Sequence, residues 1–150
     1  MAPKKIPTAA EQVEIDALRL RARQDLFWLA KSVLGFKEMT EAVHRPMANL
    51  FLVKDPTIPL YDLDEIKRRM LLAPRGSFKT CMDQADIVQL ILCYPDIRIL
   101  IITGTNDLAT KMVAELKQFF QSPVMQKLFP EYAPDPKTRW GDCSTIGRTW

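Results

Sequence analysis

Histidine, glycine and cysteine are scarce in this chain. Its 150 residues include one histidine, five glycines and three cysteines. A lone histidine, His44, excludes a histidine-rich metal site. The cysteines, Cys81, Cys93 and Cys143, have neither the CxxC nor the Cys/His spacing of a zinc site. Their odd number indicates free thiols and hence a reducing compartment.

Long apolar runs are also missing from the sequence. No stretch approaches the ~20 residues needed to cross a bilayer. The basic start, Met1 to Lys5, is not followed by the apolar segment of a signal peptide. We therefore expect a cytosolic protein with no membrane partner. A formal charge of +3 permits a nucleic-acid partner without indicating one. A composition of 47% hydrophobic and 26% charged residues is typical of a soluble globular protein.

The most informative stretch follows an apolar run and precedes a long helical pattern. It reads Ala73-Pro74-Arg75-Gly76-Ser77-Phe78-Lys79-Thr80. A strand, a tight loop, a Lys-Thr pair and a helix in this order are typical of a phosphate-binding loop. The backbone N–H groups of such a loop and of the helix N-terminus converge on phosphate oxygens. We therefore assign Lys79 to the phosphates and Thr80 to Mg²⁺.

The segment departs from the usual phosphate-loop pattern at two positions. Ala73 and Phe78 stand where the pattern G-x-x-x-x-G-K-[ST] has glycine, and Gly76 is the remaining glycine of the loop. A side chain at such a position disfavours positive φ by about 1–2 kcal/mol. The loop must therefore follow a different path or carry strain. The alternative interpretation is an ordinary strand-to-helix turn with a solvated lysine.

The apolar pattern on both sides of this segment predicts the fold. We expect a strand near 69–73, a helix over 79–94 and a second strand over 97–103. The second strand is a nearly continuous run of β-branched and leucine residues, as in strands buried on both faces of a parallel sheet. Two such strands around a helix form a right-handed βαβ unit. The predicted fold class is α/β, with a P-loop NTPase-like parallel sheet flanked by helices, incomplete in this chain and preceded by N-terminal helices.

This fold divides the sequence into a short tail and one larger unit. Residues 1–7 are expected to be a disordered basic tail, and residues 8–150 the N-terminal part of a P-loop ATPase domain. Within that part we expect a helical lead-in over 8–66, a βαβ core over 67–120, and a trailing helix and strand start over 121–150.

Capping residues mark the expected helix boundaries. The first helix should run from a Thr8 capping box to a stop at Gly35. Its three arginines are interpreted as a solvated face, with a DNA contact as the alternative. Other starts are predicted from polar N-cap residues, namely a start between Thr40 and Arg45, one at Thr105 or Asn106, and one at Ser122.

The acids that a P-loop motor needs are missing from this sequence. No later apolar strand ends in paired aspartate or glutamate residues, which would hold Mg²⁺ and orient the attacking water. The simplest interpretation is that the chain is the N-terminal part of a longer protein. On its own, we expect it to hydrolyse ATP negligibly.

Several blocks of the chain resemble the start of a known family. Between Asp25 and Phe129 the sequence is similar to the large terminase subunit, the ATPase motor that packages DNA in tailed bacteriophages. The matching blocks are Phe27-Trp28, Leu34-Gly35, Val43-His44-Arg45-Pro46-Met47, the segment from Arg69 to Thr80, Tyr94-Pro95-Asp96, Ile97 to Thr103, and Leu108 to Phe119. Terminases commonly carry a deviant phosphate loop with an arginine near its start, which Arg75 matches. Membership would also account for Phe78 in place of glycine.

The resemblance implies roles for individual residues and implies ATP and Mg²⁺ as cofactors. Residues Ala73 to Thr80 would bind the nucleotide, with Lys79 on the phosphates and Thr80 on Mg²⁺. Arg75 matches an arginine proposed to act as a finger on the γ-phosphate, and the alternative is a salt bridge that orders the loop. His44 stands nearest the place of the family's adenine-binding glutamine. An imidazole cannot make the glutamine's bidentate contact, so a helix-start polar residue is the alternative.

The resemblance also implies partners and a location. It points to double-stranded DNA, a portal protein, a small terminase subunit and a homo-oligomer on the portal, in the cytoplasm of the host. A helicase-like P-loop ATPase and a non-catalytic nucleotide-binding or interaction module are the rival interpretations. Downstream sequence separates them, because a strand ending in paired acids supports a motor and a later acidic nuclease cluster selects the terminase.

Overall fold

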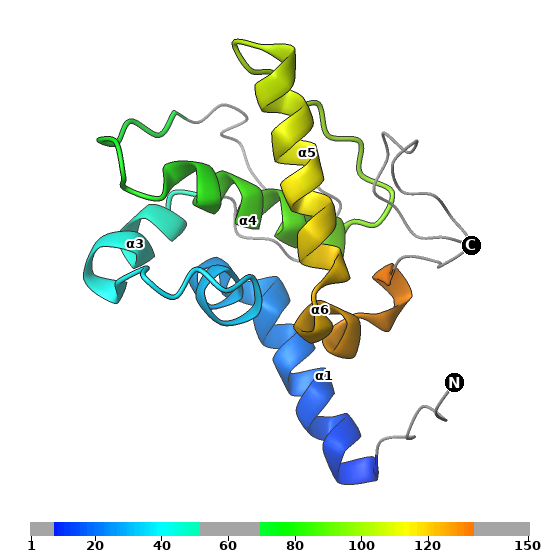
Figure 1. Cartoon of the computed structure of the whole chain (residues 1–150). Helices are drawn as coiled ribbons and strands as arrows, with labels where there is room; N and C mark the ends of the chain where they lie inside the picture. The colour runs from blue at the N-terminus through cyan, green and yellow to red at the C-terminus, as the bar shows by residue number, and fades with distance from the viewer. Residues whose placement is uncertain (1–7, 52–69, 134–150) are drawn as a thin grey trace.

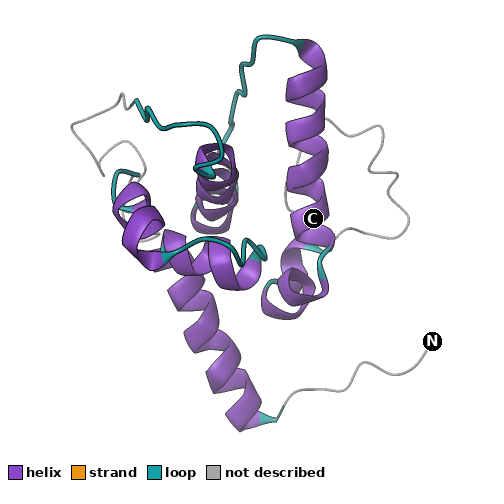
Figure 2. Cartoon of the chain, turned by 60° about the vertical axis from the view of Figure 1, so that its left-hand side comes forward, coloured by secondary structure: helices purple, strands orange, loops and turns teal. Residues whose placement is uncertain are grey.

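The computed structural model describes residues 8–51 and 70–133, and every regular element in these ranges is helical. Figure 1 shows the helices crossing one another at several angles, and Figure 2 shows only helices and loops among the described residues. None of the described helices is long and apolar enough to cross a membrane. The elements are α1 (Ala9–Gln24), α2 (Leu26–Trp28), a π-helical turn η1 (Leu29–Val33), α3 (Glu41–Ala48), α4 (Lys79–Cys93), α5 (Asn106–Gln121), α6 (Pro123–Leu128) and a 3₁₀ turn η3 (Pro130–Tyr132).

The predicted α/β class with a parallel sheet is wrong for the described residues, which contain no strand. Residues 97–103 are not helical, and their side chains alternate between half-buried and exposed. Ile97, Ile99 and Ile101 pack against the core, whereas Leu100 and Ile102 are each 82% exposed. The β-branched run therefore indicates extended backbone buried on one side. A sheet also needs a hydrogen-bonded neighbour about 4.8 Å away, which a single segment cannot specify.

The segment before the loop behaves in the same way. Met70 is 82% exposed and Leu72 is 85% exposed, and residues 70–73 are in neither a helix nor a strand. Figure 1 shows this segment leading into one end of α4, while residues 94–105 leave the other end and rise to the start of α5. The predicted βαβ core is therefore replaced by two loops around a helix.

The first predicted helix is confirmed at its start and broken before its predicted end. Thr8 donates its N–H to Glu11 Oε2 over 2.7 Å and accepts the Glu11 N–H at 3.4 Å, which completes the capping box. The helix stops at Asp25, whose φ of −111° and ψ of 97° are extended. Its carboxylate accepts the Trp28 N–H at 2.9 Å and so starts α2. Gly35, with a φ of +87°, follows the π-helical turn.

The core has two adjoining parts. The larger one joins α1, η1, α4, α5, α6 and η3, and its fully buried members include Leu29, Leu116, Phe120, Met125 and Phe129. The smaller one lies where α2 and α3 meet the first turns of α4, and its buried members are Leu26, Phe27, Ala30, Met39, Ala48, Met82 and Ala85. The predicted functional loop is thus attached to the smaller core, at the N-terminus of α4.

Side chains of neighbouring helices donate hydrogen bonds to the last carbonyl groups of α1, α4 and α6. Gln89 of α4 donates to the Ala22 carbonyl at the end of α1 over 3.1 Å, and Arg23 of α1 donates to the Leu92 carbonyl at the end of α4 over 3.1 Å. Arg19 likewise donates to the Leu128 carbonyl at the end of α6. The last carbonyls of a helix have no intrahelical partner, so these bonds satisfy groups that burial would otherwise penalise.

Two of the three arginines of α1 are therefore structural rather than a solvated face. Arg19 and Arg23 are half-buried, and both guanidinium groups lie over the Phe129 ring, 5.5 Å and 5.6 Å from its centroid. Arg19 also pairs with Glu131 at 2.6 Å. Only Arg21 is exposed, and its guanidinium lies 4.9 Å from the centroid of the Trp28 ring.

The start of α6 supplies a test of helix capping. Ser122 accepts the Met125 N–H at 3.2 Å, and Pro123 occupies the first turn, as predicted. We expect Ser122→Ala to lower the free energy of unfolding by about 1 kcal/mol, because one N–H loses its acceptor. Ser122→Asp, which keeps an acceptor, should stay close to the wild type. Urea unfolding measures both variants, and equal losses would contradict the capping role.

Candidate functional site

The candidate site is the turn between Ala73 and the first residues of α4. Gly76 has a φ of +79° and Phe78 a φ of 56° with a ψ of 19°, so both lie in the left-handed region. A Cβ built on Gly76 would meet nothing within 4 Å, and the glycine is needed there for its φ alone. The loop thus adopts the strained alternative, because Phe78 takes the conformation that glycine would normally supply. A left-handed residue of this kind costs about 1–2 kcal/mol.

Lys79 folds back across this turn. Its Nζ donates to the Ala73 carbonyl over 3.2 Å and to the Pro74 carbonyl over 3.1 Å. The Ser77 hydroxyl donates to the same Pro74 carbonyl over 2.7 Å. A lysine ammonium has three donors, so these two bonds leave one N–H for another acceptor. The positive charge of Lys79 therefore lies at the turn.

The N-terminus of α4 adds backbone donors to this charge. The first bond of the helix runs from the Met82 N–H to the Phe78 carbonyl over 2.9 Å. The N–H groups of Lys79, Thr80 and Cys81 precede it, and no side chain caps this end. An α-helix carries roughly +0.5 of an elementary charge at its N-terminus. Uncapped N–H groups, the helix dipole and the Lys79 ammonium together favour an anion at this turn.

Thr80 and Arg75 are both exposed. Thr80 follows Lys79 in the first turn of α4 and can offer its hydroxyl to a cation beside a bound anion. Arg75 lies next to Gly76 and forms no ion pair with another residue of the described ranges. No described carboxylate therefore supports the salt-bridge alternative, and the finger role of Arg75 stays a prediction.

His44 contacts the loop through the side chain of Phe78. It lies on α3 with 6% of its surface exposed, and its Nδ1 accepts the Thr40 N–H at 2.9 Å. Its ring meets the Phe78 ring edge to face, with centroids 5.4 Å apart and planes at 79°. An adenine contact for His44 is untested and stays a prediction.

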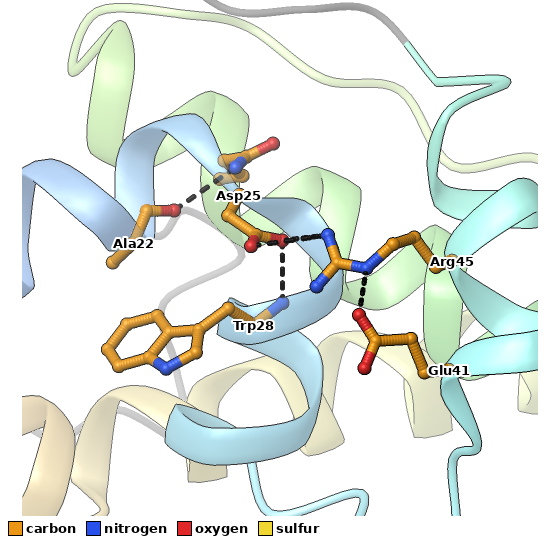
Figure 3. A network of polar contacts seen from close by, with 6 residues as sticks. Ala22, Asp25, Trp28, Glu41 and Arg45 are labelled. Carbon is orange, nitrogen blue, oxygen red and sulfur yellow. Dashed lines mark hydrogen bonds and ion pairs between the residues drawn. The ribbon is translucent and has the colours of Figure 1, made fainter.

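A polar network fixes α3, which carries His44. Figure 3 shows the Arg45 guanidinium between the carboxylates of Asp25 and Glu41. Arg45 donates to Glu41 over 2.7 Å and to both Asp25 oxygens over 3.4 Å, and it lies 4.7 Å from the Phe27 ring centroid. The hydrogen bond with Glu41, and secondarily the charge of Asp25, raise the pKa of Arg45 above its ordinary value. Sequence reasoning missed this network, although Glu41 and Arg45 have the (i, i+4) spacing of helical ion pairs.

Asp83 is another residue that its spacing in the sequence could have revealed. It follows Lys79 by one helical turn, at the (i, i+4) spacing that brings side chains together. Partial burial and the charge of Asp86 raise the pKa of Asp83, while Lys79 acts in the opposite direction. No group of three or more potential metal-binding side chains is found among the described residues. A magnesium ion bound with a nucleotide here would take phosphate oxygens and water as ligands, with Thr80 as the expected protein ligand.

Comparison of the chain with protein-family models, with curated proteins and with solved structures finds no match.

Proposed function

We propose that the turn from Ala73 to Thr80 binds the phosphates of ATP with Mg²⁺. We also propose that the chain is the N-terminal part of the ATPase motor of a phage terminase large subunit, which drives double-stranded DNA into procapsids. In that assembly its partners are the DNA, the portal protein, the small terminase subunit and further copies of itself, in the host cytoplasm. Bound Mg²⁺ would neutralise phosphate charge.

The observation that carries the proposal is the position of Lys79. Its ammonium lies over a left-handed turn, at the uncapped N-terminus of a helix of 15 residues. Positive charge and free N–H groups converge there, and these are the groups that a triphosphate requires. The terminase resemblance of the blocks around this turn supplies the biological context.

A non-catalytic nucleotide-binding module is the second candidate. P-loop motors hold Mg²⁺ with the P-loop Ser/Thr and with an aspartate of a Walker-B motif, which follows a strand. Residues 8–51 and 70–133 contain helices and no strand, and this arrangement favours the non-catalytic module. Such a module would bind ATP without turning it over. Binding and turnover experiments therefore separate the two candidates.

Binding is tested by replacing Lys79. We expect Lys79→Ala to weaken the affinity for a slowly hydrolysed ATP analogue with Mg²⁺ about 10- to 150-fold, the worth of a charge-assisted hydrogen bond. Isothermal calorimetry measures the affinity, and the melting temperature shows whether the variant remains folded.

Lys111→Ala is the matched control, because Lys111 is exposed on α5 and its loss removes the same charge. Its affinity should equal that of the wild type. Absence of binding by the wild type, or equal losses in the two lysine variants, would refute a phosphate site at this turn.

A further inference from the structure

Phe78 is the one non-glycine residue with positive φ in the described ranges. A bulky side chain in this conformation is held by its surroundings and does not adopt it by preference. Two contacts of the Phe78 side chain hold it in this conformation. The ring packs against the smaller core, formed by α2, α3 and the first turns of α4, and its edge-to-face partner is His44.

The His44 ring is itself held firmly. The Thr40 N–H lies 2.9 Å from His44 Nδ1, and the Thr40 carbonyl oxygen and hydroxyl lie 3.1 Å and 3.4 Å from the same nitrogen. The next residue, Arg45, ties α3 to Asp25 at the start of α2. The ring that Phe78 meets is thus a fixed part of the helical body.

We propose that the His44–Phe78 contact holds the phosphate loop in its binding shape, which makes His44 a positioning residue and makes nucleotide affinity depend on the placement of α3. Packing of the Phe78 ring offsets the backbone cost of the left-handed conformation, so the N–H groups of the turn are aligned before a phosphate arrives. A glycine at this position would leave the turn free to move. The inference rests on the proposed phosphate site and adds a role for α3 that a bare loop would not have.

The first experiment compares three replacements of His44. His44→Ala removes both the ring and the acceptor for Thr40, and should weaken binding of the magnesium-bound ATP analogue about 2- to 12-fold, the worth of an edge-to-face aromatic pair. His44→Phe restores a ring and should return affinity close to the wild type. His44→Gln restores only an acceptor and should resemble His44→Ala. Rescue by Gln and not by Phe would overturn the proposal, because the Thr40 cap would then be the cause.

Inorganic tripolyphosphate separates positioning from adenine recognition. It carries the phosphates without a base, so a positioning role predicts the same fold loss for tripolyphosphate as for the ATP analogue. A loss seen with the analogue alone would overturn the proposal in favour of an adenine contact. In a Phe78→Gly background His44→Ala should have no effect on either probe, and a full effect there would also overturn it.

A nucleotide-free measurement distinguishes failure of this inference from failure of the proposed function. Trypsin cleaves after Arg75 when the turn opens, and cleavage tracks the open population. Without any ligand, His44→Ala should accelerate cleavage at the Arg75–Gly76 bond about 2- to 12-fold, and His44→Phe should not. Cleavage after Lys111, on α5, is the internal control.

Unchanged cleavage in His44→Ala would overturn the His44–Phe78 contact as the element that holds the loop. Accelerated cleavage together with no binding of either phosphate probe by the wild type would refute the phosphate site. In that case the contact would still be supported as the element that holds the loop.

Discussion

Replacing Arg75 with alanine is expected to lower ATP turnover about 10³- to 10⁵-fold in the whole motor protein that we propose contains this chain. Nucleotide affinity should remain nearly unchanged. An arginine finger gains most of its interaction as negative charge spreads over the γ-phosphate oxygens in the transition state, so its loss falls on kcat. Arg75 suits this role because it is exposed within the turn and has no ion pair with a described residue.

Single-turnover ATPase assays and calorimetry with a slowly hydrolysed analogue measure the two quantities separately. Arg75→Lys is the matched variant and should not restore turnover, because a point charge cannot reproduce the planar guanidinium fork. Turnover within a few-fold of the wild type would exclude the finger. Joint loss of nucleotide binding and thermal stability would favour a structural ion pair for Arg75.

The sequence predicts the helices after the loop well, because their boundaries depend on local chemistry. α4 was expected over 79–94 and extends over Lys79–Cys93. Thr105 caps α5 by accepting the Leu108 N–H at 3.4 Å, and Ser122 caps α6. These signals lie within three or four residues of one another in the chain, so no tertiary contact is needed to interpret them.

The sheet could not be judged from local chemistry. The run over 97–103 has the composition of a strand, yet whether a strand pairs depends on the position of another backbone. The break of the first predicted helix at Asp25 could not be predicted either, because the apolar stripe continues on both sides of this residue. Its carboxylate caps α2 by accepting the Trp28 N–H, and that local bond competes with a continuous helix.

The candidate site was predicted in part. The loop residues and the Lys79 charge follow from the spacing alone. The spacing left open whether the loop takes a different path or carries strain, and the φ of 56° at Phe78 shows the strain. The edge-to-face contact between Phe78 and His44 joins residues 34 positions apart in sequence, and no local pattern reports it. The structural use of Arg19 and Arg23 was missed for the same reason, because their acceptors lie on α6 and α4.

Phe129 is the point at which the long-range contacts of Arg19 and Arg23 converge, and its replacement by alanine is expected to lower the free energy of unfolding by about 3–5 kcal/mol. The ring is 1% exposed and meets the Tyr132 ring at a centroid distance of 6.5 Å. Its loss leaves a cavity and also removes the aromatic face beneath Arg19 and Arg23, an interaction worth about 0.5–2 kcal/mol for each cation.

Urea unfolding with Phe129→Leu as the matched variant separates volume from aromatic character. Leucine keeps most of the apolar volume, so its packing loss should stay below about 1.5 kcal/mol, with the cation–π loss added to it. Val13→Ala is the surface control, since Val13 is 71% exposed, and it should change stability by no more than about 0.5 kcal/mol. If Phe129→Ala lost no more than this surface control, Phe129 would not be the convergence point of α1, α6 and η3. If leucine cost as much as alanine, the aromatic face beneath the two arginines would outweigh the cavity.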